Sequence, residues 1–146
     1  MRLLRQPALV LLLLAGVLVL AACGGSAQNT TSVAALPDWA RSAPPRVREA
    51  YQYAVANPEE LKKYPCYCGC GAMGHTSNLS CYIQDIAPDG AITFDTHALG
   101  CGICVDITQD VMRLKAEGKT SLAVRAYVDA RYSPFGPPTN TPLPVD

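Results

Sequence analysis

Six cysteines and both histidines of the chain fall between positions 66 and 104. Thiolate sulfur is a ligand that copper(I), zinc and iron–sulfur clusters accept, and imidazole nitrogen suits copper and zinc as well. This clustering of donor types predicts a metal site. The candidate ligands are Cys66, Cys68, Cys70, Cys81, Cys101 and Cys104, with His75 and His97 as weaker candidates.

Two cysteine motifs have different local chemistry. In the first, Cys66, Cys68 and Cys70 alternate with single spacers, so an extended chain places the three thiols on one face about 6.6 Å apart. A glycine-rich turn would bring them closer together. In the second, Cys101 and Cys104 lie where a helix is predicted to begin. The free amides and the dipole of that helix favour thiolate over thiol, most strongly at Cys101.

Two other interpretations of the cysteines stay open. Six is an even number, so disulfides between the first three cysteines and the last three would make a stapled interaction module in an oxidising compartment. Cys101 and Cys104 also have the spacing of a thiol-disulfide redox protein, although no parallel strand is predicted after their helix. The histidines favour the metal, because a disulfide framework has no use for them.

The N-terminal segment has the layout of an export signal. Residues 1–5 carry two arginines, and residues 7–22 are uncharged and almost wholly apolar. This apolar run is shorter than the roughly 20 residues that a membrane-spanning helix needs. The four residues that end at Cys23 resemble the lipobox of bacterial lipoproteins, which implies removal of residues 1–22 and lipid attachment to Cys23. We therefore expect an extracytoplasmic protein that is anchored to the cell membrane by its lipid.

The charge of the chain excludes one class of partner. Its 12 cationic side chains balance its 12 acidic ones, and removal of residues 1–22 would take away Arg2 and Arg5. The remainder is slightly acidic, so no nucleic-acid partner is expected. We see no nucleophile motif and the acidic residues are scattered, so no enzyme is expected either.

The remaining chain is predicted to form one small domain of the mainly α class (small α+β). Its three to four helices would surround a cysteine-rich loop region with a short β-hairpin. The predicted helices cover residues 46–57, 58–64, 103–117 and a last segment capped by Thr120, and the hairpin lies between Tyr82 and Asp95. The predicted organisation is a flexible tether over residues 23–37, the domain over 38–133 and a disordered proline-rich tail over 134–146.

The cysteine motifs also carry a family resemblance. The heptapeptide from Pro65 to Gly71, the segment from Ser77 to Tyr82, and the Gly-Cys-Gly-Ile-Cys run that ends at Cys104 are similar to the bacterial PCYCGC-motif lipoprotein family. The similarity covers about residues 45–132. It implies export and the cysteine pattern, whereas the metal hypothesis depends on the donors themselves.

These observations together predict a lipid-anchored protein that binds metal outside the cytoplasm. Copper(I) is the first candidate and zinc the second, and Met73 adds a thioether that suits copper. The expected role is sequestration, delivery or resistance, with a metal transporter or another envelope protein as the candidate partner.

Overall fold

The structure is a computed structural model that describes residues 36–145. The predicted signal peptide, Cys23 and residues 23–35 of the predicted tether lie outside the described residues. Leu36 is already fully buried, and its carbonyl accepts a hydrogen bond from Arg41. Ordered structure therefore begins at least two residues before Asp38, where the sequence predicted it to start.

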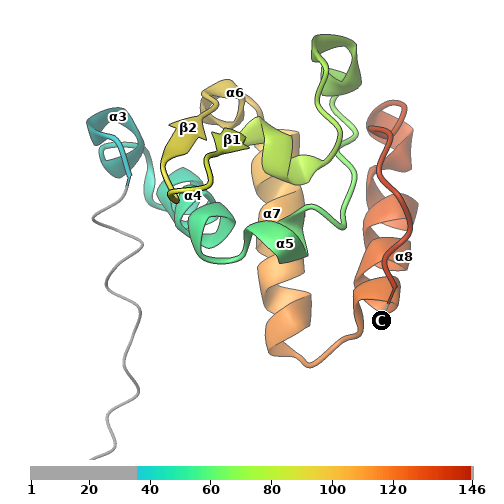
Figure 1. Ribbon diagram of the computed structural model, residues 1–146. Helices are drawn as coiled ribbons and strands as arrows, with labels where there is room; N and C mark the ends of the chain where they lie inside the picture. The colour runs from blue at the N-terminus through green and yellow to red at the C-terminus, as the bar shows by residue number, and fades with distance from the viewer. Residues whose placement is uncertain (1–35, 146) are drawn as a thin grey trace, which may run out of the picture. The chain divides into compact units, whose positions relative to one another are not determined.

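Three helices form the scaffold. Helix α4 (Pro45–Ala56) and helix α8 (Ser121–Tyr132) both pack against helix α7 (Gly102–Ala116), which lies between them (Figure 1). Proline at the first position of α4 fits a helix start because its missing N–H would have no helical partner there. The Thr120 hydroxyl accepts a hydrogen bond from the Ala123 amide and caps α8, as predicted.

Shorter elements lie around this scaffold. Strands β1 (Ile83–Ile86) and β2 (Ile92–Phe94) pair antiparallel and form the predicted hairpin. Helix α5 (Pro58–Leu61) is the predicted second helix, three residues shorter at its end. The sequence did not predict the four-residue helices α3 (Asp38–Arg41) and α6 (His97–Gly100). Three 3-10 turns complete the described residues: η1 (Cys70–Met73), η2 (Asn78–Cys81) and η3 (Ser133–Phe135).

Apolar side chains from the three scaffold helices form the core. Buried positions recur at helical spacing in each helix, because one stripe of an amphipathic helix faces the interior. A column of aromatic rings extends this core toward the hairpin: the Tyr51 ring lies edge-on to Trp39 and to Tyr82, at centroid distances of 5.4 and 4.9 Å. The core thus reaches the base of the cysteine-rich segment.

The prediction of a disordered tail over residues 134–146 is wrong for its described part. After η3 the chain runs back along α8 (Figure 1), and the buried Arg125 guanidinium donates hydrogen bonds to the carbonyls of Thr141 and Pro142. Thr139 and Thr141 are buried. The prolines lack backbone donors, so hydrogen bonds to other segments hold this tail in place.

The predicted class, a small and mainly α fold with a hairpin, is confirmed. The described residues contain six α-helices, two more than the largest number predicted, because α3 and α6 are single turns. None of the helices in residues 36–145 is long and apolar enough to cross a membrane.

Candidate metal centre

Glycine shapes the first cysteine motif. Gly69 and Gly74 flank η1 with φ angles of 84° and 90°, a region that side-chain-bearing residues rarely adopt. The left-handed turn at Gly69 reverses the chain between Cys68 and Cys70. The motif therefore forms the glycine-rich turn that the sequence allowed, and this turn brings its thiols together without a fully extended chain.

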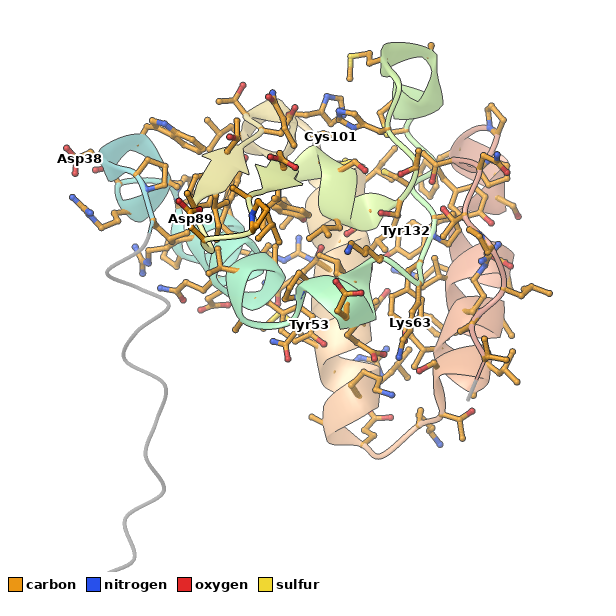
Figure 2. All side chains as sticks on the ribbon, viewed as in Figure 1. Asp38, Tyr53, Lys63, Asp89, Cys101 and Tyr132 are labelled. Carbon is orange, nitrogen blue, oxygen red and sulfur yellow. The ribbon has the colours of Figure 1, made fainter. Side chains whose placement is uncertain are left out.

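The second motif lies at the start of α7, as predicted. Cys101 is the N-cap residue of this helix, and Cys104 lies on its buried face. Figure 2 shows Cys101 at the end of α7 that lies near the hairpin and α6. Helix α6 directly precedes α7, and it begins at His97, whose backbone amide donates a hydrogen bond to the Asp95 carboxylate. This short helix turns the His97 ring toward the cysteines.

A buried polar network fixes Cys104. Its carbonyl accepts hydrogen bonds from the Asn78 side-chain amide at 3.2 Å and from the Tyr82 hydroxyl at 2.9 Å. The Thr108 hydroxyl donates to the Asn78 side-chain oxygen at 2.7 Å. The sequence prediction missed these positioning residues. Asn78 and Tyr82 lie within a segment that carried the family resemblance, and this was the only signal for them.

The tail is hydrogen-bonded to the chain on both sides of the η1 turn. The Cys66 amide donates to the Thr139 hydroxyl and the Thr139 amide donates to the Cys66 carbonyl, both at 2.9 Å. The Thr139 hydroxyl is 3.0 Å from that of Thr141, which donates to the Thr76 carbonyl at 2.6 Å. A chain of hydroxyl groups thus connects Cys66 to Thr76 across the turn.

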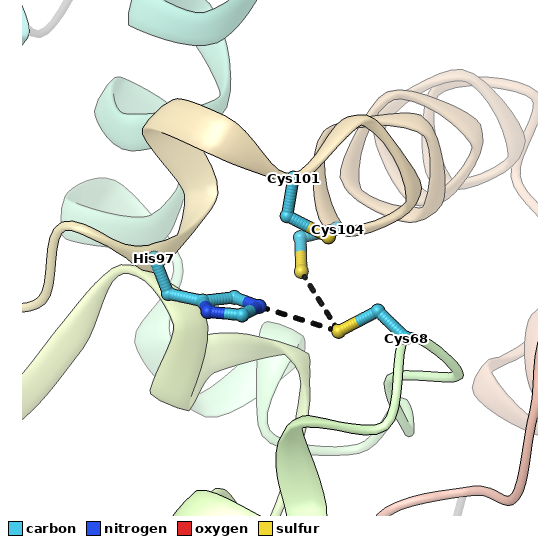
Figure 3. A group of neighbouring side chains, drawn as sticks. All are labelled: Cys68, His97, Cys101 and Cys104. Atoms are coloured by element: carbon cyan, nitrogen blue, oxygen red, sulfur yellow. Dashed lines mark hydrogen bonds between the residues drawn. The ribbon is translucent and has the colours of Figure 1, made fainter.

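The cysteine sulfurs lie close together without being bonded. The Sγ atoms of Cys66 and Cys104 are 3.3 Å apart, and those of Cys66 and Cys68 are 3.4 Å apart. Cys68 Sγ lies 3.6 Å from Cys104 Sγ and 3.3 Å from His97 Nε2. Figure 3 marks these two contacts with dashed lines. Cys70 and Cys81 are 3.7 Å apart. A disulfide bond is about 2.05 Å long, so the six cysteines of this segment are free thiols.

All six predicted cysteine ligands and His97 fall into groups whose donor atoms lie within 4.8 Å of one another. His75 joins them through Cys81, whose Sγ is 3.5 Å from its Nδ1. The ring of His75 faces that of His97 at a centroid distance of 5.2 Å. The structure therefore gathers the predicted donors at one place, where a soft metal ion could be held.

The thioether of Met73 lies apart from these groups. Its side chain is 59% exposed and lines a shallow surface pocket beside the two histidines. Asp95 and Thr96 complete this pocket. Met73 is therefore on the outside of the cluster, at the edge where the imidazoles reach the surface.

Crowding makes the thiols unequal. Hydrogen bonds from the thiols of Cys104 and Cys81 lower the pKa of the Cys66 thiol. The hydrogen bond to Cys66 raises the pKa of the Cys104 thiol. The pKa of the Cys68 thiol is raised mainly by burial and, second, by the negative charge of Cys66. A thiolate at Cys66 thus favours the protonated form of Cys104 and Cys68. A metal cation would remove this restriction, because a coordinating thiol loses its proton.

The structure has only some of the features expected of a thiol-disulfide redox protein. Cys101 is partly exposed and Cys104 lies buried behind it, as that interpretation predicts. However, both residues belong to one group with Cys68 and His97. The only sheet in the described residues is the antiparallel hairpin, whereas a redox fold of this type needs a βαβ unit.

Comparison with known families places the chain by its cysteine motif. A family model described as a protein of unknown function with PCYCGC motif matches residues 20–144. The chain belongs to this family. Neither the curated proteins nor the solved structures gave a match.

The PCYCGC match is longer than the resemblance seen in the sequence. It extends past residue 132 to residue 144, and so includes the tail that contacts Cys66 and Thr76. It also begins before Cys23. The tail is thus part of the PCYCGC domain by both sequence match and hydrogen bonding.

Proposed function

We propose that this PCYCGC protein is a lipid-anchored, extracytoplasmic metal-binding protein that sequesters copper(I) or zinc or delivers it to an envelope partner. One observation carries the proposal: donors distant in sequence, on the turn around η1, on α6 and at the start of α7, converge with sulfur separations of 3.3 to 3.7 Å. Thiols that merely filled a core would not need imidazoles beside them.

The donor set helps to choose the ion. Cys68, Cys101, Cys104 and His97 form a four-residue group, and three cysteines with one histidine are a known tetrahedral set for structural zinc. Zinc also neutralises more of the thiolate charge than copper(I) does. The cluster therefore supports zinc at least as well as copper(I), which the sequence alone placed first.

Metal content tests the proposal directly. The full chain, purified in detergent with and without reductant, would be analysed by elemental mass spectrometry and by titration of free thiols. We expect at least one zinc or copper ion per chain in the reduced protein, and a lower metal content in Cys68→Ser. The Asp89→Asn variant, which changes an exposed residue in the hairpin turn, should keep its metal.

A different result would replace metal binding with another function. A chain that holds no metal and titrates fewer than about one thiol would be a disulfide-stapled interaction module. A chain that holds no metal but in which only Cys101 and Cys104 cycle between thiol and disulfide would be a redox protein.

The anchor needs a separate experiment, because Cys23 lies outside the described residues. Mass spectrometry of the mature N-terminus should find a diacylglycerol on Cys23, and two or more acyl chains give stable membrane attachment. The Cys23→Ser variant should leave the membrane fraction. Retention of that variant in the membrane would contradict a lipid anchor.

A further inference from the structure

The donors divide into two sets of four. The first set is the group of Cys68, His97, Cys101 and Cys104, whose ligand atoms all lie within 4.8 Å of one another. Figure 3 shows His97 reaching toward Cys68 from α6, while Cys104 reaches it from α7. This set alone could complete a tetrahedral site.

The second set contains the remaining donors. Cys66, Cys70 and Cys81 are pairwise within the same 4.8 Å limit, and His75 Nδ1 lies 3.5 Å from Cys81 Sγ. The other ring nitrogen of His75 lies 3.7 Å from the Asp95 carboxylate. Metal-bound imidazoles commonly place a carboxylate at their second nitrogen, where it orients the ring. His75 and Asp95 have this arrangement.

The two sets differ in their access to solvent. In the second set the three cysteines, Cys66, Cys70 and Cys81, are at most 2% exposed, and His75 alone is partly exposed. In the other set only Cys104 is fully buried, whereas Cys68, Cys101 and His97 are partly exposed. An ion in the exposed set could leave through small movements of side chains. An ion in the buried set could leave only if the turn around η1 opened.

Cys66 and His97 each lie close to both sets, since His97 is also within 4.8 Å of Cys70 and Cys81. A neutral imidazole has one acceptor nitrogen and binds a single ion, whereas a thiolate can bridge two, so Cys66 connects the sets. It shares a 4.8 Å group with Cys68 and Cys104 on one side and with Cys70 and Cys81 on the other. Charge also favours more than one ion, because six thiolates around one zinc would leave four uncompensated negative charges in the interior. A second zinc halves that excess.

We propose that the cluster binds two metal ions that share the Cys66 thiolate: an inner ion that is retained and an outer ion that exchanges. The inner ion is held by Cys66, Cys70, Cys81 and His75. The outer ion is held by Cys68, Cys101, Cys104 and His97, and the shared Cys66 thiolate is its fifth ligand. Each thiol gives up its proton to solvent as the ion binds. This inference rests on the proposed function, and it identifies the outer set as the part that passes metal to a partner.

Isotope exchange tests the division. The full chain would be loaded with zinc, counted by elemental mass spectrometry, and then mixed with an excess of a heavy zinc isotope. We expect two ions per chain and two phases of exchange, with the inner ion slower by about ten-fold or more, because its release requires a larger opening. Loading with an NMR-active cadmium isotope should show coupling between two cadmium signals through the shared sulfur.

Matched substitutions assign the two phases. His97→Gln should accelerate only the fast phase and His75→Gln only the slow phase. Cys101→Ser should remove the fast ion and keep the slow one. Cys70→Ser should remove the slow ion and keep the fast one. If this buried variant does not fold, the two histidine substitutions still test the assignment, since His75 and His97 are at partly exposed positions.

The outcomes separate this inference from the proposed function. A chain without metal overturns both. One ion per chain, a single exchange phase, or equal effects of the two histidine substitutions overturn the inference and leave metal binding intact. Two uncoupled cadmium signals would show that Cys66 is not shared.

Discussion

The helical scaffold and the cysteine-rich segment are stabilised in different ways. Helices α4, α7 and α8 bury stripes of apolar side chains such as Ile107, Val111 and Val128, and each such side chain contributes about 1.5 to 3 kcal/mol by burial. Residues 65–81 contain two 3-10 turns and neither an α-helix nor a strand. Their interior is made mostly of thiols, tyrosine rings and polar bonds. We therefore expect the scaffold to form without metal, and the segment, which has less apolar packing, to depend on the proposed metal.

Metal removal should give the largest difference in stability between the two regions. A structural zinc site contributes about 10 kcal/mol or more to folding, so a chelator should lower the Tm by well over about 10 °C. Hydrogen exchange should then show fast exchange at Cys66, Cys70 and their neighbours while amides within α7 stay protected. Equal loss of protection in both regions would show that the scaffold depends on the metal too.

Loss of the Asn78 side chain should cut the main polar link between the regions. Asn78→Ala removes a donor to the Cys104 carbonyl and the acceptor of the Thr108 hydroxyl, both fully buried. We expect a loss of about 3 kcal/mol in the free energy of unfolding. Chemical denaturation of the metal-loaded chain measures it. Asn140→Ala, at an exposed position, should change stability by less than about 0.5 kcal/mol.

A weaker effect is expected where the tail meets the first motif. Thr139→Val keeps the size of the side chain but removes the hydroxyl that accepts from the Cys66 amide. The expected loss is about 1 to 2 kcal/mol, with faster hydrogen exchange at Cys66. Thr93→Val, at the exposed middle position of β2, is the matched control and should be neutral. An unchanged Cys66 amide would show that the tail does not hold the motif.

The smallest effect on stability is expected at Met73. Because this side chain is 59% exposed, Met73→Leu should change the free energy of unfolding by less than about 0.5 kcal/mol. It should nevertheless slow loading with copper(I) and leave zinc loading unchanged, since a thioether prefers copper. Stopped-flow loading measures both rates, with Met112→Leu on α7 as the control. Equal copper(I) rates would mean that Met73 takes no part in metal entry.

Periodicity explains which parts of the fold were predictable. Helices α4, α7 and α8 repeat apolar residues at helical spacing, and Pro88 with Asp89-Gly90 marks the hairpin turn, so each was predicted near its observed bounds. Helices α3 and α6 have only four residues each, too few to show a period. The tail was mistaken for disorder because its order comes from Arg125 and Cys66, which are distant in sequence.

The candidate site was predictable in its donors but not in their arrangement. Cysteine and histidine are chemically distinctive, so Cys68 and His97 could be proposed from residue type and clustering alone. The division of the eight donors into an exposed and a buried set could not be predicted, because it depends on which face of each turn packs against the core. The roles of Asn78 and Asp95 arise only after folding, because neither has a local sequence pattern that indicates a buried bond or a contact with an imidazole.

The hydroxyl chain between Cys66 and Thr76 has a consequence for the order in which the protein is made. The ribosome adds Thr139 and Thr141 after all the cysteines and both histidines. In a growing chain, the thiols are therefore made before the two threonines whose hydrogen bonds hold the turn around them. The thiols are most open to oxidation or to a wrong ion during that interval, which lasts until Thr139 and Thr141 can reach the turn around η1.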